Sequence, residues 1–214
     1  MDAGTTGRLG VKGYHRFVFD SEQRRLVSAF EEMYQAEDSE GFDSWHQDDV
    51  RHLSKQISLA ILADYNFARV LDVGCGKGAF TRWLQRANNE VVALDLSETA
   101  LRVARGRYPG IDFRQADLCD PAFDLGSLGR FDLVCCLETL SYLDEWRALL
   151  TAFTGVAVHA LVALYLPPDP IGTVKSFDEL RAAFAASFML LQEVHLEPQR
   201  QLILFGRRLE PPRG

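Results

Sequence analysis

The architecture of this chain follows from one stretch, Val70-Leu71-Asp72-Val73-Gly74-Cys75-Gly76-Lys77-Gly78-Ala79-Phe80. Its first residues are mostly apolar and β-branched, which is typical of a buried strand. Three glycines at alternate positions follow at once, and Phe80, Trp83 and Leu84 then share one face of a predicted helix. Glycines allow left-handed backbone and close approach of a ligand, and a helix start offers unpaired N–H groups. The stretch therefore predicts a strand, a tight turn and a helix that form a nucleotide-binding corner.

The spacing of the glycines indicates which ligand this corner binds. Gly74, Gly76 and Gly78 form GxGxG, whereas dinucleotide-binding turns carry GxGxxG. Asp72 precedes the turn, where its carboxylate would repel a pyrophosphate and attract an ammonium. S-adenosylmethionine carries an α-ammonium and no phosphate. The stretch thus resembles motif I of the class I S-adenosylmethionine-dependent methyltransferases, which implies S-adenosylmethionine as the cofactor, with the backbone of Cys75 facing it.

The composition indicates one ordinary globular domain of 214 residues, 47% hydrophobic and 25% charged. The net charge of -7 argues against broad binding to a nucleic-acid backbone. No stretch approaches the ~20 apolar residues of a membrane span, and the amino terminus lacks a secretory signature. The cysteines lack metal-ligand spacing and are expected to be reduced thiols: Cys75, Cys119, Cys135 and Cys136. We expect a cytoplasmic protein without a metal site, a membrane segment or a nucleic-acid partner; the sequence does not indicate its oligomeric state.

Residues 1–19 are glycine-rich and predicted to form a flexible N-terminal arm. Residues 20–210 are predicted to form a single domain, with a helical cap over 20–66 and a Rossmann-like core over 67–210. An alternative for the arm is that it anchors on the domain or folds over a substrate through Tyr14, Phe17 and Phe19.

Two helices are predicted in the cap. Asp20 is a predicted N-cap, followed by an apolar stripe at helical spacing that includes Leu26. Asp48 is predicted to begin a second helix, with Val50 and Leu53 on its apolar face. In the methyltransferase family that the turn resembles, such an extension covers the cofactor and helps to shape the acceptor pocket.

The second predicted strand, 90–95, ends in a carboxylate. Asp95 follows Gly74 by 21 positions, near the ~20-residue offset at which an acidic residue meets ribose hydroxyls in nucleotide-binding folds. Asp95 is therefore a predicted ribose ligand, with Leu96 against the adenine. The alternative is that this acidic residue belongs to the cap of the next helix, which Ser97 is placed to begin.

Two further strands are predicted over 111–117 and 130–138. The resemblance implies that Asp117 accepts from the adenine amine and that Leu118 presents its backbone to a ring nitrogen, although a turn aspartate is the alternative. The strand predicted over 130–138 ends at Glu138, beside the switch point where ligands bind in doubly wound sheets.

The remaining pattern completes the predicted sheet. A helix from near Asp144 and a strand over 160–166 precede a capping box at 176–179, and two apolar runs, 188–196 and 201–205, form a hairpin. A terminal antiparallel hairpin resembles the ending of the class I methyltransferases, and the resemblance covers roughly residues 20 to 208. It implies a three-layer α/β fold with a Rossmann-like seven-stranded sheet in the order 3-2-1-4-5-7-6, the last strand antiparallel.

A second, shorter resemblance concerns the acceptor. The segment 137–143 resembles nodulation-type N-methyltransferases, which act on amino sugars. Glu138 and Tyr142 of this segment and His46 of the cap are the predicted catalytic residues. Glu138 would hold an ammonium or take a proton, Tyr142 would orient the acceptor, and His46 would act as a base. Trp45 is predicted beside the cofactor or the acceptor. The alternatives are that Glu138 only accepts a hydrogen bond from the backbone or the cofactor, that Tyr142 and Trp45 are packing residues, and that His46 is a loop histidine.

The leading hypothesis is a cytoplasmic S-adenosylmethionine-dependent methyltransferase that acts on a nitrogen or oxygen of a small molecule, mainly by proximity in a closed pocket. The alternatives are a methyltransferase acting on a protein or RNA, a non-catalytic subunit that binds S-adenosylmethionine, and a nicotinamide oxidoreductase. The predicted cofactor-binding residues are Asp72, Gly74, Cys75, Gly76, Gly78, Asp95, Leu96, Asp117, Leu118, Glu138 and Trp45.

Overall fold

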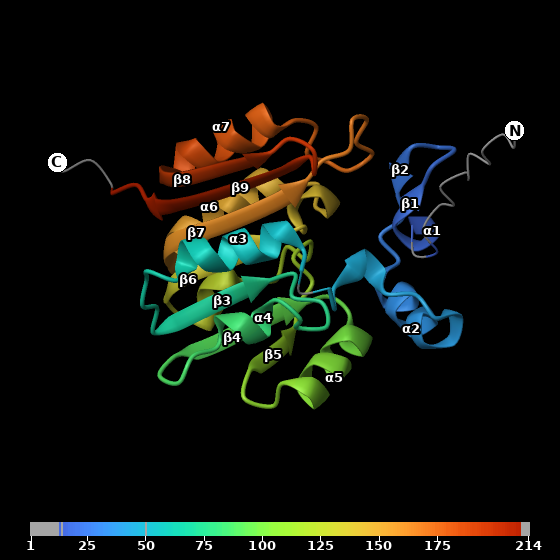
Figure 1. The fold of residues 1–214 in the computed structure, drawn as a ribbon, viewed down its shortest axis with the longest axis horizontal. Coiled ribbons are helices and arrows are strands. Elements are labelled where there is room, and N and C mark those ends of the chain that lie inside the picture. The colour runs from blue at the N-terminus through green and yellow to red at the C-terminus, as the bar shows by residue number, and fades with distance from the viewer. Residues whose placement is uncertain (1–12, 14, 50, 211–214) are drawn as a thin grey trace, which may run out of the picture.

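The protein, seen in a computed structural model that describes residues 13, 15–49 and 51–210, is built around one twisted sheet (Figure 1). The seven strands lie in the order β5-β4-β3-β6-β7-β9-β8. Only the last strand in the chain is antiparallel to its neighbours. The predicted sheet and its strand order are therefore confirmed. The strands are β3 Arg69–Val73, β4 Glu90–Asp95, β5 Asp112–Gln115, β6 Phe131–Leu137, β7 Ala157–Tyr165, β8 Phe188–Leu196 and β9 Gln201–Arg208.

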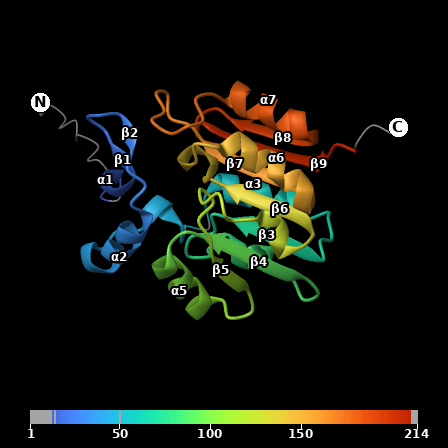
Figure 2. The same cartoon turned by 180° about the vertical axis from the view of Figure 1, so that it is seen from behind.

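Helices cover both faces of this sheet. One core cluster packs α6 (Trp146–Val156) and α7 (Phe177–Ser187) on one face. The other cluster packs α3 (Leu53–Leu62), α4 (Thr81–Leu84) and α5 (Glu98–Arg107) on the opposite face, as the front and rear views show (Figures 1 and 2). Because the central strands are parallel and buried on both faces, they read as continuous apolar runs rather than alternating ones.

Two predicted helix N-caps, Ser176 and Ser97, are present in the structure. Ser176 caps α7 by accepting from the N–H of Glu179, and Ser97 caps α5 by accepting from the N–H of Ala100. The helix predicted after the glycine turn is a single four-residue turn, α4. Within it Trp83 is exposed rather than packed inward, and its indole lies 4.1 Å from the guanidinium carbon of Arg82.

The predicted start of the first helix in the cap, at Asp20, is wrong. Oδ1 of Asp20 accepts from the N–H of Glu22 and of Gln23, as an N-cap would. However, Arg24 has φ 51°, which turns the chain back, so that β1 (Phe19–Asp20) pairs with β2 (Arg25–Leu26). A short α1 (His15–Val18) precedes this hairpin, and the helix α2 (Phe30–Glu40) begins only after it.

The second predicted cap helix also begins later than expected, at Leu53 instead of Asp48. Residues 44–46 form the 3-10 helix η1 (Ser44–His46), and Asp43 accepts from the N–H of Asp48. These side-chain hydrogen bonds to the backbone compete with helix formation. The predicted positions Tyr14 and Val50 lie outside the described residues.

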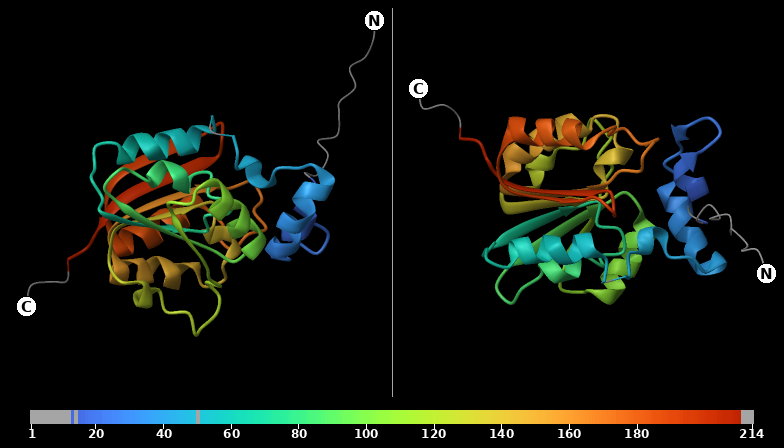
Figure 3. Two further views of the ribbon diagram at one scale, coloured as in Figure 1. Left: turned by 90° about the horizontal axis from the view of Figure 1, so that it is seen from below. Right: turned by 45° about the horizontal axis from the view of Figure 1, so that its top comes forward.

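The N-terminal elements α1, β1, β2 and α2 stand beyond the end of the sheet at which the parallel strands finish (Figure 3). Glu31 of α2 accepts from the hydroxyls of Ser97 and Thr99 at the start of α5, each at 2.5 Å. The glycine turn after β3 lies at the same end. The cap is thereby fastened to the side of the sheet where ligands bind in this class of fold.

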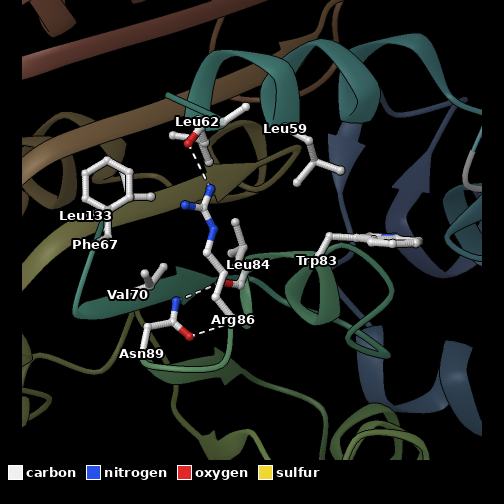
Figure 4. A pocket seen from close by; sticks show the side chains of 10 residues that line it. Leu59, Leu62, Phe67, Val70, Trp83, Leu84, Arg86, Asn89 and Leu133 are labelled. Atoms are coloured by element: carbon white, nitrogen blue, oxygen red, sulfur yellow. Dashed lines mark hydrogen bonds between the residues drawn. The ribbon is translucent and has the colours of Figure 1, made fainter. Parts of the chain in front are cut away.

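Two peripheral features complete the fold. A hollow of about 190 Å³ lies beneath α3, where Arg86 donates to the carbonyl of Leu62 and Asn89 to that of Leu84 (Figure 4). The edge strand β8 exposes Met189, Leu190 and Leu191 near a β-bulge. In the described part of the chain, no helix combines the length and apolarity that a membrane crossing requires.

Candidate functional site

A cavity of about 790 Å³ opens at the carboxyl ends of the parallel strands and extends under the N-terminal elements. Its size falls within the ~300–1,000 Å³ typical of small-molecule sites. Most of the predicted site residues line it, on the cofactor side Asp72, Gly74, Cys75, Asp95, Leu96, Asp117 and Leu118, and on the outer side Trp45, His46, Glu138 and Tyr142. Among the described residues that line it, Gly76 and Gly78 do not appear.

The glycines of the turn make room for protein as well as for a ligand. Gly74 has φ 77°, and a Cβ there would lie 2.0 Å from the hydroxyl of Thr139, which follows β6. Gly76 has φ 53°, and a Cβ there would lie 2.4 Å from Gln47. Gly78 has φ 76° and faces the ring of Phe113 in β5. Each position therefore requires glycine because of the backbone conformation and a close neighbour.

Asp72 is a buried carboxyl group at the bottom of the cavity. Its side chain is 3% exposed and accepts from the hydroxyl of Thr81 at 2.6 Å. Burial raises the pKa of Asp72 to about 7. An ammonium placed in the cavity beside this group would favour its ionised form, so the site fits a ligand with a cationic amino group.

Asp95 and Asp117 lie further along the same side of the cavity. Asp95 accepts from the N–H of Gly76 at 2.7 Å and from that of Ser97 at 2.9 Å. Burial raises the pKa of Asp95, and these backbone donors oppose that effect. Asp117 lies two residues beyond β5 and accepts from the N–H of Cys119 at 2.8 Å. Both carboxyl groups thus stabilise local turns and also line the cavity.

An ion-pair network that sequence reasoning missed joins the cap to the glycine turn. Lys77 is buried, and its ammonium lies 2.9 Å from Glu37 of α2 and 2.7 Å from Asp43. Burial disfavours this charge, but the hydrogen bonds that the ammonium donates to Asp43 and Glu37 outweigh that effect and raise the pKa of Lys77. Gln47 accepts from the backbone N–H of Lys77 and donates to the hydroxyl of Tyr34. The cap therefore closes directly on the turn.

The outer end of the cavity is aromatic. The ring of Tyr142 lies 5.4 Å from Phe30, 5.9 Å from Trp45 and 6.0 Å from Phe19 between centroids. The indole N–H of Trp45 donates to the hydroxyl of Tyr142 at 2.9 Å. We call these four rings, from β1, α2, η1 and the 3-10 helix η3 (Leu140–Tyr142), the aromatic wall. Phe17 packs with these rings in a cluster that also contains Met33 and Tyr34 of α2.

Glu138 is the first residue after β6 and lines the cavity between its cofactor side and its outer side. Its carboxylate accepts from the N–H of Tyr165 at 2.8 Å and from the amide of Gln201. The residue has φ 59°, an unfavourable conformation that points to a constrained position. Burial raises the pKa of Glu138 to about 7. Glu138 can therefore exchange a proton near neutral pH.

His46 and Lys55 form the polar rim of the outer end. His46 is exposed, has φ 51°, and lines the cavity. Lys55 of α3 donates to the carbonyls of His46, at 3.3 Å, and Gln47, at 2.8 Å. Burial lowers the pKa of Lys55, against the opposing effect of nearby carboxylates. Sequence reasoning missed Lys55 as a cavity residue, because a lysine between the apolar positions of an amphipathic helix is expected on the polar face of that helix.

The cysteines of the described chain are free thiols, and burial raises the pKa of Cys75 well above its ordinary range. Cys75 is thus a protonated thiol inside the turn at neutral pH. Among residues 13, 15–49 and 51–210, no group of three or more His, Cys, Asp and Glu side chains is placed to hold a metal ion.

Comparison with known proteins identifies relatives of the chain. A family model described as a methyltransferase domain matches residues 70–158. Magnesium-protoporphyrin O-methyltransferase of Rhodobacter capsulatus is 37% identical in an alignment of 155 residues that covers 69% of this chain and 61% of that protein. A ubiquinone biosynthesis O-methyltransferase of Xylella fastidiosa is 30% identical in an alignment of 187 residues that covers 76% of this chain and 71% of that protein. The chain thus spans less than two thirds of the first relative's length.

Solved structures show the same fold. The magnesium protoporphyrin IX methyltransferase of Synechocystis with bound SAH has a TM-score of 0.63 at 19% identity, covering 82% of this chain and 98% of that one. The N-methyltransferase NodS of Bradyrhizobium japonicum with S-adenosyl-L-homocysteine has a TM-score of 0.64 at 18% identity, covering 83% and 98%.

Proposed function

We propose that this chain, which belongs to the class I S-adenosylmethionine-dependent methyltransferases, transfers a methyl group to a nitrogen or oxygen atom of a small-molecule acceptor. The observation that carries the proposal is the division of one cavity. Its inner half presents Asp72, Asp95 and Asp117 at the ends of successive strands, and its outer half presents the aromatic wall. Two different ligands would thus meet at the switch point of the sheet.

The inner half fits S-adenosylmethionine. Asp72 would hold the ammonium, Asp95 the ribose hydroxyls, and Asp117 the adenine amine, with Leu96 and Leu118 beside the base. Gly74 and Cys75 would face the amino-acid part, and Gly76 would act indirectly, because its N–H holds Asp95. When bound, S-adenosylmethionine supplies an electrophilic methyl group on a positively charged sulfur.

The outer half would position the acceptor. The aromatic wall would exclude water and, with the hydroxyl of Tyr142, would orient the reacting atom; such positioning supplies much of the rate of a bimolecular transfer. An acceptor O–H or N–H loses one proton when it gains a methyl group. Glu138, whose pKa burial raises to about 7, is placed at the boundary and would take that proton on its carboxylate. His46 on the exposed rim would act as the alternative base.

The relatives favour a small acceptor, since they are named for a magnesium porphyrin and for ubiquinone biosynthesis. The proposal includes either a nitrogen or an oxygen atom as the methylated atom. It also places the reaction in the cytoplasm, without a nucleic-acid partner. The net charge of -7 supports the last point.

Binding and turnover test the proposal separately. Calorimetry with S-adenosylhomocysteine should show binding, which Asp95→Ala should weaken by about 1–3 kcal/mol if the hydroxyl contacts are made. Incubation with methyl-labelled S-adenosylmethionine and a panel of phenols, carboxylates and amines should label at least one acceptor, and Glu138→Gln should lower that rate without abolishing binding. No binding at millimolar ligand would overturn the proposal. Binding without turnover, together with a stable protein partner, would favour a non-catalytic subunit.

A further inference from the structure

We propose that the phenolic hydroxyl of Tyr34, in α2 of the cap, donates a hydrogen bond to the carboxylate of the amino-acid part of the cofactor. This inference rests on the proposed function and deepens it, because it gives a partner to the one anionic group of S-adenosylmethionine. Three features of the inner half carry it: the direction of a short chain of hydrogen bonds, the state of the N–H groups in the glycine turn, and the local charge.

A chain of two hydrogen bonds runs from the glycine turn through Gln47 to Tyr34, and its direction is fixed. The backbone N–H of Lys77 donates to Oε1 of Gln47 at 2.9 Å. Because a backbone N–H can only donate, the oxygen of the Gln47 amide faces the turn and its nitrogen faces Tyr34. That nitrogen donates to the hydroxyl oxygen of Tyr34 at 2.6 Å. The proton of the Tyr34 hydroxyl therefore points away from Gln47.

This proton makes Tyr34 a hydrogen-bond donor on the cofactor side of the cavity. Tyr34 is 6% exposed and lines the cavity, and its oxygen lies 2.8 Å from the position of a Cβ added to Gly76. Burial raises the pKa of the phenol well above its ordinary range, so the proton is kept at neutral pH. Among the residues that the structure describes, none accepts this proton, and a buried donor without an acceptor is costly. An accepting atom of a ligand would remove that cost.

The glycine turn has no spare donors of its own for an anion. Each backbone N–H group of residues 74–78 already donates to an acceptor within the protein. In chain order, these acceptors are the carbonyl of Leu94 twice, the carboxylate of Asp95, the side chain of Gln47 and the carbonyl of Cys75. A ligand carboxylate that lies over this turn therefore needs a donor from another element, and the hydroxyl of Tyr34 lies next to Gly76.

The charge of the inner half makes such a donor necessary. Asp72 and Asp95 lie at the ends of neighbouring strands, where their carboxylates suit an ammonium and the ribose hydroxyls. The same carboxylates repel an anion, so the carboxylate of the cofactor requires a compensating hydrogen bond. A hydroxyl that donates to a carboxylate forms a charge-assisted hydrogen bond, which is roughly twice as strong as a neutral one.

A purely structural role for the hydroxyl provides the alternative. Tyr34 packs beside Trp45, with 6.2 Å between the ring centroids, and Tyr34→Phe keeps this ring while it removes the hydroxyl. If the hydroxyl only accepts from Gln47, its loss should weaken every ligand of the inner half to the same degree. Tyr65 offers a matched control, because it packs against the core beneath α3 and is not among the described residues that line the cavity.

The test uses the full chain and two probes, S-adenosylhomocysteine and its decarboxylated analogue, which keeps the ammonium, the ribose and the adenine. By calorimetry, the unmodified protein should bind S-adenosylhomocysteine about tenfold more tightly than the analogue, as expected for one charge-assisted hydrogen bond. Tyr34→Phe should lower the affinity for S-adenosylhomocysteine about tenfold and leave the affinity for the analogue unchanged. Tyr65→Phe should change neither affinity.

Equal affinity of the unmodified protein for the two probes would overturn this inference, whether or not Tyr34→Phe folds. So would a preference for S-adenosylhomocysteine that persists in Tyr34→Phe. An equal loss of affinity for both probes in that variant would show that the hydroxyl has only a structural role. If the unmodified protein bound neither probe, the proposed methyl transfer itself would be overturned, and this inference with it.

Discussion

Two carboxyl groups, the buried Asp72 and the half-buried Glu138, titrate near neutral pH for the same reason and serve different ends of the cavity. Burial raises the pKa of each to about 7. Asp72 has a single hydroxyl donor, from Thr81, whereas Glu138 accepts from two groups of β7 and β9. A cationic ligand beside Asp72 can therefore change its protonation more readily than it can change that of Glu138, whose donors already favour the anion.

The raised pKa of Asp72 predicts a pH-dependent affinity for S-adenosylhomocysteine. As the pH falls through about 7, the free protein takes up a proton on Asp72, and binding an ammonium then requires that proton to leave. The affinity should fall with decreasing pH, by up to about tenfold per unit. Asp72→Asn should weaken binding at pH 8 and flatten this profile in calorimetry. Asp117→Asn is the control that keeps the slope; an unchanged slope in Asp72→Asn would contradict the assignment.

Gly76 provides a second prediction for a single residue. It has φ 53°, a conformation that strains any residue with a side chain, and a Cβ there would lie 2.4 Å from the amide end of Gln47, which would have to shift. Gly76→Ala should lower the free energy of unfolding in urea by about 1–3 kcal/mol. Gly106 lies in α5 with open space around it, so Gly106→Ala should raise the same quantity by about 0.5–1 kcal/mol. Equal effects of the two substitutions would show that the turn is not constrained.

At the scale of elements, the junction between the cap and the glycine turn depends on Lys77. The side chains of Lys77 and Glu37 are 6% and 9% exposed, so the pair is removed from solvent. Breaking such a pair leaves one charge buried without compensation, which costs more than the pair itself contributes.

Lys77→Met should lower the free energy of unfolding by about 3–5 kcal/mol, because Glu37 loses its partner. The double variant Lys77→Met with Glu37→Gln should recover part of the loss. Arg114→Ala, which removes an exposed pair with Asp112, should cost less than about 1 kcal/mol. Urea denaturation measures all three, and a loss in Lys77→Met no larger than that in Arg114→Ala would contradict a structural role for the pair.

Local sequence patterns predict those elements whose signals lie within a few residues. The strands β4 and β8 have their predicted limits, and Ser176 begins a helix as its capping box indicates. Asp20 shows the limit of such reasoning, because its hydrogen bonds to backbone N–H groups serve a hairpin turn as well as a helix. The left-handed conformation of Arg24, which decides between the two, has no glycine or asparagine to announce it.

In the candidate site, too, local patterns predict some residues and miss those that depend on distant parts of the chain. Asp72 and Asp95 could be predicted because each lies near the carboxyl end of a buried strand, and parallel strands bring these ends to one edge. Lys77 could not, because its partner Glu37 lies 40 residues earlier on another element. Gly76 and Gly78 remain predicted cofactor contacts, and a Cβ added to them would meet Gln47 and Phe113 respectively. A glycine pattern indicates close approach without saying what approaches.

For the whole molecule, ligand binding should raise thermal stability selectively. A ligand at 100 times its dissociation constant adds about 2.7 kcal/mol to the folded state. For a domain of this size that corresponds to a rise of roughly 5–10 °C in the melting temperature. S-adenosylhomocysteine should produce this rise, and NADH should not, because Asp72 would repel a pyrophosphate. A rise with NADH alone, in the same scan, would contradict the reading of the turn.

The hydrogen bond from the amide of Lys77 to the side chain of Gln47 has a consequence for the dynamics of the cap. This proton is protected by the cap instead of by a strand of the sheet. Its exchange with deuterium therefore requires Gln47 to swing away, whereas the neighbouring amide of Gly78 is protected by the carbonyl of Cys75 within the turn. Comparing the two exchange rates would time how often the entrance to the cavity opens.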